Sequence, residues 1–485
     1  MSNDRSIALK GGFWTSVSSA VTMGTTFARV MILTRFLQKS DFGVVSIINM
    51  VIGLCITFTD LGFASVIMYK HKLTQREFST LFWTQLFLFV LIYLVICSTS
   101  SLISTFYDES TLSILIPIAS LSVICQAFGK LYDSLLQKQY KFRLLAYRNI
   151  ISNLASLIVA WLMAAAGYGV YSLIFSTLSQ TIILNIWNFI YGYKIQQIRF
   201  VFNFREIIPL IKIGIYQTGT RILDFLSSKL DVMIIGKLLG TESLGVYDLA
   251  KELVFKLVDF IRSVVSKVAL PILTNNNSND DSVRSKFLNV TKIVATLCIP
   301  LCLGIVVFSK DLVHVVYGEQ YLDIAPIVSV FSVITIFTSI TCFFDMLGIA
   351  KGRTDLNFKN TIYRIIITSP VVFLCSHISI LAVSIGQLLA TIIMTVIFWK
   401  VVVMNTYPIS VRQYLSQFSK LLIVVVLISL LIYCVSILEN ALINNLSWII
   451  KFSLNIILYF ILLILGTRFF LMKDLSDFIQ LIKRK

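Results

Sequence analysis

Long apolar runs follow one another along the whole chain, and only short polar connections separate them. A membrane-spanning helix needs about 20 mostly apolar residues, and the runs meet that length. No ten-residue alternation of polar and apolar residues recurs, as a transmembrane barrel would require. The sequence therefore predicts an all-α, polytopic membrane protein with about fourteen transmembrane helices. The apolar runs are 11–35, 42–69, 79–106, 111–136, 146–166, 170–192, 207–235, 243–271, 287–308, 322–349, 358–376, 378–399, 417–438 and 446–471.

The composition agrees with this pattern. Of the 485 residues, 57% are hydrophobic and only 13% are charged, and the mean hydropathy is +0.87. Soluble domains are about 45–50% apolar and about 25% charged. A water-soluble protein is therefore excluded.

The net charge of +17 could indicate a nucleic-acid partner if the protein were soluble. However, 29 of the 41 Lys and Arg lie in connections on one side of the predicted spans, including Arg148 at the end of the connection 130–148. Four lie on the other side, and eight lie within spans. Basic residues gather on the cytoplasmic side of membrane proteins. Both termini are therefore predicted to be cytoplasmic, and nucleic acid is excluded as a partner.

No pattern of catalytic or metal-binding residues appears. The eight Cys form no CxxC pair, and we interpret them as small core hydrophobes. The three His are dispersed, and the chain has neither a GxxxxGK[ST] nor an HExxH motif. The sequence thus predicts no enzyme, no metal and no cofactor. A gradient of H⁺ or Na⁺, the membrane potential or the substrate's own gradient would supply the energy for transport.

A gapless shift of 202 residues aligns two parts of the chain, and Gly43-Val44 then meets Gly245-Val246. Six spans separate the copies, so both have the same orientation. Parallel halves place a substrate site between them and permit rocking between inward and outward access. We predict an N-lobe over 1–206, a C-lobe over 207–405 and a C-terminal helix pair over 406–485.

One face of the first two helices is polar in both copies, because the polar residues recur at helical spacing. We expect these faces to line a shared internal space. They consist of Thr15, Ser19, Thr22, Thr26 and Arg29; Ser46, Asn49, Gly53, Thr57 and Asp60; Gln217, Arg221, Asp224, Ser228 and Asp231; and Asp248, Lys251, Phe255, Asp259 and Arg262.

Eleven charged residues lie in the runs 207–235 and 243–271. An uncompensated charge in the membrane costs about 3 kcal/mol, so these residues must be paired or hydrated. A hairpin that turns near Gly240 brings opposite charges to equal depth, either as a structural ladder or as the wall of a hydrated cavity. Arg262 and Lys267 are expected to find no acid in this hairpin. The expected pairs are Asp231–Lys251, Lys229–Glu252, Asp224–Lys256 and Arg221–Asp259.

Arg29 is expected to have no acidic partner in its own hairpin. It falls opposite Ser46–Asn49, and Asp60 lies about 12 residues away in register, or ~18 Å at 1.5 Å per residue. An intramembrane Arg indicates function by default, and a guanidinium binds phosphate bidentately. Arg29 is therefore predicted either to contact an anionic substrate or to pair with another span.

Several short motifs point to a known family. They are Gly12-Phe13-Trp14, Leu33-Thr34-Arg35-Phe36-Leu37, Asp41-Phe42-Gly43, Asp60-Leu61-Gly62, the run from Leu135 to Arg143, and the run from Leu239 to Ala250. On these motifs the chain resembles polysaccharide flippases of the Wzx type. They form the polysaccharide transporter branch of the multidrug/oligosaccharidyl-lipid/polysaccharide (MOP) exporter superfamily.

The resemblance implies two six-helix lobes in a V, a cationic central cavity and a C-terminal helix pair that holds a lipid tail. It also implies translocation of undecaprenyl-diphosphate-linked oligosaccharide, for O-antigen lipopolysaccharide, capsule or exopolysaccharide, by alternating access across the bacterial inner membrane. The implied partners are this glycan, membrane lipids and other polysaccharide-assembly membrane proteins.

Within that reading, two groups of residues are candidates for the site. Two alternative functions stay open. A cation-coupled drug exporter of the same superfamily would require an acidic cavity. A membrane-embedded glycan polymerase would need a larger outer loop. The predicted substrate contacts are Arg29, Asn49, Gln217, Arg221 and Arg262, and the residues predicted to set cavity charge or couple an ion are Asp60, Asp224, Asp231, Lys251, Lys256 and Asp259.

Overall fold

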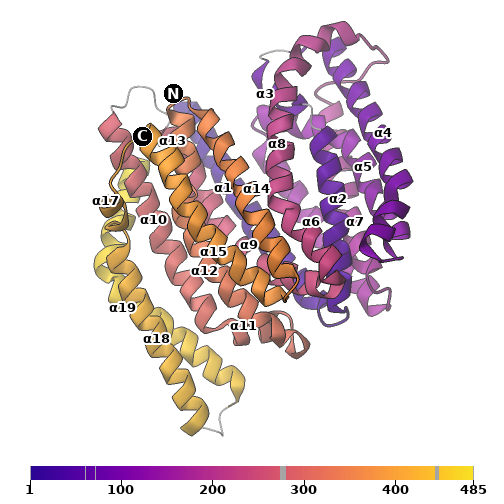
Figure 1. Ribbon diagram of the computed structural model, residues 1–485. Coiled ribbons are helices and arrows are strands. Elements are labelled where there is room, and N and C mark those ends of the chain that lie inside the picture. Colours follow the sequence, from indigo (N-terminus) through magenta and orange to yellow (C-terminus); the bar gives the residue numbers. More distant parts are fainter. Residues whose placement is uncertain (1, 60–61, 71–72, 274–279, 443–446, 484–485) are drawn as a thin grey trace. The chain divides into compact units, whose positions relative to one another are not determined.

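The computed structural model describes residues 2–59, 62–70, 73–273, 280–442 and 447–483 (Figure 1). Helices make up nearly all of these residues, and no strand occurs among them. The prediction of an all-α membrane protein is confirmed. Contacts divide the chain into two compact units, Met1–Asp248 (unit 1) and Leu249–Lys485 (unit 2). The predicted lobes and C-terminal pair rest on the sequence repeat and stay predictions.

Unit 1 is built from eight helices and the start of a ninth. Its strongest packing runs along α5 with α7, α4 with α5, α6 with α7, and α1 with α6. The helices are α1 (Ser2–Leu33), α2 (Lys39–Thr59), α3 (Phe63–Tyr69), α4 (Gln75–Tyr107), α5 (Leu112–Lys138), α6 (Phe142–Ala165), α7 (Tyr171–Tyr193), α8 (Phe204–Leu238) and α9 (Gly240–Leu273).

Unit 2 contains the rest of α9 and the remaining helices. Here α10 packs against α12, α14 against α15, and the pair α18–α19 against α10. The elements are α10 (Asp280–Val307), α11 (Ser309–Val316), η1 (Glu319–Ile324), α12 (Ala325–Thr341), α13 (Phe344–Ala350), α14 (Thr354–Ser376), α15 (Ile380–Phe398), η2 (Trp399–Val403), α16 (Met404–Thr406), α17 (Val411–Leu415), α18 (Ser419–Leu442) and α19 (Trp448–Lys483).

Each of the fourteen predicted apolar runs coincides with a helix or a short series of helices. Eleven helical segments of the described chain are long and apolar enough to cross a membrane. Three further helices, α8, α9 and α14, contain 35, 34 and 23 residues but carry several charged side chains. The chain is therefore a multi-pass membrane protein, and the count of fourteen spans stays a prediction.

Ion pairs and side-chain contacts join connections that the sequence places on the same side of the membrane. At the predicted outer side, Lys237 pairs with Asp108 at 2.7 Å. At the predicted inner side, Lys351 pairs with Asp280 at 2.8 Å, and this hydrogen bond raises the pKa of Lys351. Both contacts join connections that the predicted alternation places on one side, and the cytoplasmic position of the termini stays a prediction.

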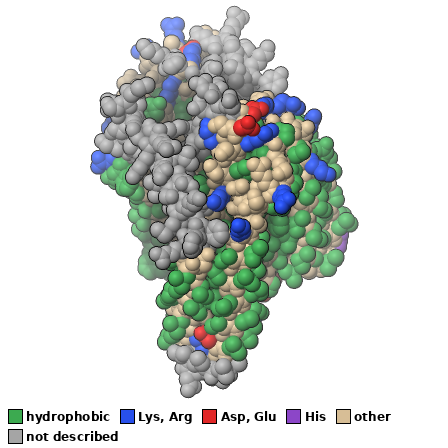
Figure 2. All heavy atoms as spheres, turned by 90° about the vertical axis from the view of Figure 1, so that its left-hand side faces the viewer, with side chains coloured by type: hydrophobic (Ala, Val, Ile, Leu, Met, Phe, Trp, Pro, Cys, Tyr) green, Lys and Arg blue, Asp and Glu red, His purple; other side chains and the backbone are tan. Residues whose placement is uncertain are grey.

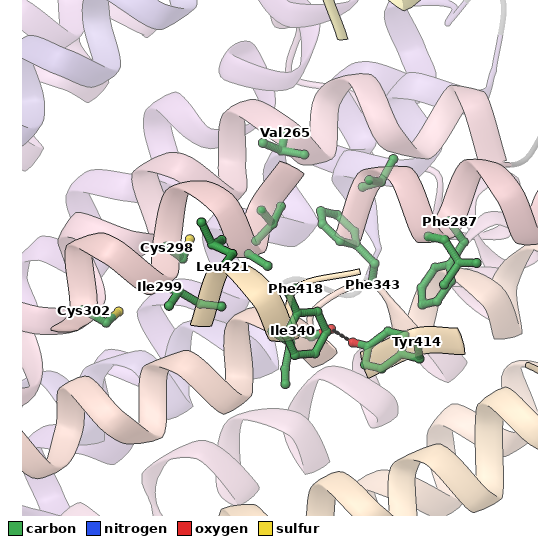
Figure 3. Packing of buried hydrophobic residues seen from close by; sticks show 14 of the residues in the cluster. Val265, Phe287, Cys298, Ile299, Cys302, Ile340, Phe343, Tyr414, Phe418 and Leu421 are labelled. Atoms are coloured by element: carbon green, nitrogen blue, oxygen red, sulfur yellow. Dashed lines mark hydrogen bonds between the residues drawn. The ribbon is translucent and has the colours of Figure 1, made fainter. Parts of the chain in front are cut away.

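The core of unit 2 surrounds a break between α12 and α13, at Cys342 and Phe343. The hydroxyl of Tyr414 donates a hydrogen bond to the carbonyl of Ile340 in the last turn of α12 (Figure 3). Tyr414 is only 3% exposed, and its ring packs against Phe344 and Phe418. Because a helix end leaves carbonyls without intrahelical partners, this buried hydroxyl stabilises the break.

Apolar side chains cover much of the outer surface of the C-terminal helix pair (Figure 2). Exposed residues on α18 and α19 include Ile423, Leu427 and Ile464, which are 59–62% accessible. A surface of this kind is unfavourable in water and suits contact with acyl chains.

Candidate functional site

A polar seam joins α1 to α6 in unit 1. Asn149 donates to the hydroxyl of Ser18 and Asn153 to that of Thr22, each at 3.3 Å. One turn further along α6, the hydroxyl of Ser156 accepts a hydrogen bond of 3.1 Å from Arg29. These residues are three, four or seven positions apart, which places them on one face of each helix.

The predicted polar face of 11–35 therefore lies at least partly against a helix rather than an open space. Thr22 and Arg29 both hydrogen-bond to α6, whereas Thr15 and Ser19 donate to backbone carbonyls of α1. The sequence analysis considered partners for Arg29 mainly on the run 42–69, and it did not identify this contact with α6.

At the predicted cytoplasmic end of this seam lies a buried arginine, Arg148, which is 6% exposed. One guanidinium nitrogen lies 2.5 Å from the carboxylate of Asp133 on α5 and 2.5 Å from the amide oxygen of Asn188 on α7. Asn149 accepts two further hydrogen bonds from it. Arg148 thus joins α5, α6 and α7 at one point.

The sequence analysis missed this cluster because it assigned Arg148 to a connection. A signal was present: Asn149, Asn153 and Ser156 place a polar stripe directly beside it on the same helix. A hydrogen-bond partner as distant in sequence as Asn188 could not be identified without the structure.

The starts of α2 and α9 approach closely through two glycines related by the repeat. A Cβ atom on Gly43 would collide with the carbonyl of Thr241, and one on Gly245 would collide with the carbonyl of Lys39. Thr241 and Gly245 follow Lys39 and Gly43 by 202 residues. The contact therefore joins positions that the predicted repeat makes equivalent, and the repeat itself stays a prediction.

Asp231 is the most buried of the predicted acidic site residues, at 7% exposure. Its carboxylate accepts hydrogen bonds from the hydroxyl of Tyr247 at 2.6 Å and from the backbone N–H of Val232 at 2.9 Å. Tyr247 lies on α9. In the predicted hairpin, its depth in the membrane is nearly that of the residue predicted to pair with Asp231. The four predicted cross-helix ion pairs stay predictions.

Arg262 has an acidic partner within α9, and the expectation that it would find none in the hairpin is wrong. It lies 3.3 Å from the carboxylate of Asp259, three residues earlier and therefore on the same side of the helix. A second nitrogen donates to the hydroxyls of Thr338 at 2.6 Å and Ser339 at 3.2 Å on α12. The side chain is thus fixed between α9 and α12.

The other predicted residues lie in both units, and Lys256 pairs with Glu252 one turn away within α9. Asn49, Arg221, Asp224 and Asp259 are exposed, whereas Lys251 and Lys256 are half-buried. Asp60 and the side chain of Gln217 lie outside the described residues. Their predicted roles stay predictions.

Solved structures with the same fold define the class of protein. A structure described as lipid II flippase MurJ in an inward closed conformation matches 95% of this chain and 99% of its own, with a TM-score of 0.72 and 16% identity. An inward-facing multidrug resistance MATE transporter of the MOP superfamily matches 80% of this chain and 94% of its own, with a TM-score of 0.62 and 13% identity. The chain therefore has the fold of MOP-superfamily transporters.

Sequence comparison then identifies the family. A family model described as "Polysaccharide biosynthesis protein" matches residues 32–326, and the chain belongs to this family. The teichuronic acid biosynthesis protein TuaB of Bacillus subtilis is 27% identical, over 72% of each chain. The lipopolysaccharide biosynthesis protein WzxC of Escherichia coli is 23% identical, over 85% of this chain and 84% of its own. The resemblance to Wzx-type flippases is confirmed.

Proposed function

We propose that this protein is a flippase that moves undecaprenyl-diphosphate-linked oligosaccharide repeat units across the bacterial inner membrane by alternating access. Its membership of the polysaccharide biosynthesis family carries the proposal. Relatives over most of its length are named for lipopolysaccharide and teichuronic acid biosynthesis, and its fold is shared with a structure named as a lipid II flippase.

The reciprocal contact of Gly43 and Gly245 supports alternating access. Both glycines are buried, and both begin helices at the side predicted to face outward. Glycine permits close backbone approach without interlocking side chains, so such a contact closes tightly and separates readily. We assign it the role of the outer closure, which opens to release the glycan.

Arg29 and Arg262 are proposed to contact the diphosphate or an acidic sugar. The guanidinium of Arg29 donates to the hydroxyl of Ser156, and that of Arg262 donates to the hydroxyls of Thr338 and Ser339 beside its ion pair with Asp259. A guanidinium can bind phosphate oxygens bidentately, so both side chains suit an anionic substrate. Arg221, Asn49 and Gln217 are proposed as further contacts.

The acidic residues are proposed to set the charge of the cavity and to couple transport to H⁺ or Na⁺. Asp231 and Asp259 lie near hydroxyl or guanidinium groups. Asp60, Asp224, Lys251 and Lys256 belong to the same proposed set. Collapse of the proton or sodium gradient by an ionophore is expected to slow export if coupling operates.

A cell lacking this protein tests the function. We expect it to accumulate lipid-linked repeat units with full-length glycans on the cytoplasmic leaflet, and the intact chain to restore export. Unchanged lipid-linked glycan together with increased sensitivity to cationic drugs would favour a drug exporter. Normal repeat-unit export with altered polymer length would favour a polymerase. Both termini are proposed to be cytoplasmic, and other polysaccharide-assembly membrane proteins are proposed as partners.

A further inference from the structure

The linker between α7 and α8, residues 194–203, is tied firmly to the start of α4. Its backbone groups take part in five hydrogen bonds of 2.9–3.3 Å with side chains of unit 1. These hydrogen bonds hold the backbone of four of its ten residues, 196, 197, 199 and 203. The side chains that hold it are Gln75, Ser79, Thr80, Trp83 and Tyr132.

The fixed linker turns one set of apolar side chains inward and another outward. Ile195 and Ile198 pack against the buried core of unit 1 around Phe78 and Tyr132. Phe200 points away from that core and is 92% exposed, and Phe202 is 61% exposed. The hydrogen bonds therefore keep these two aromatic rings exposed at the surface, where contact with water is unfavourable.

The length of α4 places this aromatic surface at the membrane boundary. The helix has 33 residues, or about 50 Å, whereas the hydrocarbon core is about 30 Å thick. The polar residues Gln75, Arg76 and Glu77 precede its apolar run, so this end of α4 extends into the headgroup layer. Trp83 lies two turns from the start, and its ring lies 4.8 Å from that of Phe200. Tryptophan is enriched at this depth in membrane proteins.

The charges around the linker are basic. Arg76, Lys194 and Arg199 are exposed on or beside it. The nearby acid Glu77 pairs with Lys70, so it does not offset these three charges. Each basic side chain at the surface of an acidic membrane increases the affinity of its segment for that membrane about fivefold.

We propose that residues 194–203 form a membrane-interface anchor that binds acidic phospholipid headgroups through Lys194 and Arg199, with Phe200 and Phe202 among the upper acyl chains. The anchor would fix the junction between the two repeated halves in the cytoplasmic leaflet. It rests on the geometry of the linker and not on the identity of the transported molecule.

Quenching of Trp83 by brominated lipids tests the anchor. The full chain is reconstituted in bilayers in which either phosphatidylglycerol or phosphatidylcholine carries bromine, at equal mole fraction. Because the chain has six Trp, the contribution of Trp83 is the difference between the intact protein and Trp83→Phe. We expect stronger quenching by the brominated phosphatidylglycerol, and a loss of about fivefold in this preference in Arg199→Gln.

Arg353→Gln is the matched control, since Arg353 is also an exposed basic residue in a predicted cytoplasmic connection but pairs with Asp355. Native mass spectrometry of retained phosphatidylglycerol gives a second readout that does not depend on Trp83. Equal quenching by both lipids, with equal lipid retention in Arg199→Gln and Arg353→Gln, would overturn the proposal. Quenching of Trp83 by aqueous acrylamide but by neither lipid would also overturn it, in favour of water or a protein partner.

Discussion

Arg148 and Arg29 are two basic residues of unit 1 whose surroundings differ in kind. Arg148 has a carboxylate, Asp133, within 2.5 Å and is almost fully buried. Arg29 is half-buried and donates to the hydroxyl of Ser156. A buried ion pair with satisfied hydrogen bonds holds helices together, whereas an arginine within a predicted membrane span indicates a functional role by default. We therefore expect replacement of Arg148 to lower the stability of the protein and replacement of Arg29 to lower transport.

Replacement of Arg148 by Met is expected to destabilise the protein by about 3–5 kcal/mol, because Asp133 would be left without its buried partner. Thermal unfolding in detergent measures this effect. Arg143→Gln is the control, since Arg143 is exposed beside Trp14. Adding Asp133→Asn to Arg148→Met should recover part of the loss. An equal loss in the Arg143 and Arg148 variants would contradict the structural role.

Replacement of Arg29 by Ala is expected to abolish or strongly reduce glycan export at a normal protein level, whereas Arg29→Lys should retain part of it through its charge. Export in a complemented deletion strain, with protein quantified in the membrane, measures both variants. Ser156→Ala separates a positioning effect from a charge effect, because it removes the hydroxyl and leaves the guanidinium. Normal export by Arg29→Ala would rule out its proposed role.

At the scale of elements, α2 and α9 meet through glycines that the repeat makes equivalent. Gly43→Ala should impair closure of this contact, since a methyl group would meet the backbone of Thr241, and overpacking of this kind typically costs about 1–3 kcal/mol. We expect reduced export with the protein still inserted. Gly219→Ala is the matched control, because a Cβ there meets nothing within 4 Å. Equal export by the two variants would contradict the outer closure.

The break between α12 and α13 depends on one hydroxyl. Tyr414→Phe leaves the carbonyl of Ile340 without the hydroxyl it accepts from, and a buried unsatisfied polar group costs about 1–3 kcal/mol. Thermal unfolding is expected to show this loss. Tyr433→Phe provides the comparison, since Tyr433 is 53% exposed. A melting temperature equal to that of the Tyr433 variant would show that the hydrogen bond does not stabilise the break.

Helix positions could be predicted from the sequence because length and hydrophobicity are properties of each segment alone. Helix neighbours could not. The polar spacing correctly places Thr22 and Arg29 on one face of α1, but their partners on α6 come from more than 120 residues away. The assumption that consecutive spans pair as hairpins also hid Arg148, whose counterion lies on α5 and whose amide partner lies on α7. Long-range register depends on packing that single-chain periodicity does not contain.

At the scale of the whole molecule, the chain has the fold of MOP-superfamily transporters and belongs to the polysaccharide biosynthesis family. The fold is shared with drug transporters, so it does not identify the substrate. The family match favours a large anionic lipid-linked glycan over a small cation. Translocation of such a glycan is therefore the central claim.

Translocation by the purified protein tests that claim most directly. Vesicles are made with fluorescent diphosphate-linked glycolipid in both leaflets, with and without the protein, and a membrane-impermeant enzyme then cleaves the glycan exposed outside. We predict that the inner pool becomes accessible in vesicles holding the intact chain and stays protected with Arg29→Ala. The account would be contradicted if the inner pool of glycolipid stayed protected from the enzyme in vesicles that hold correctly folded, intact protein, under every imposed ion gradient.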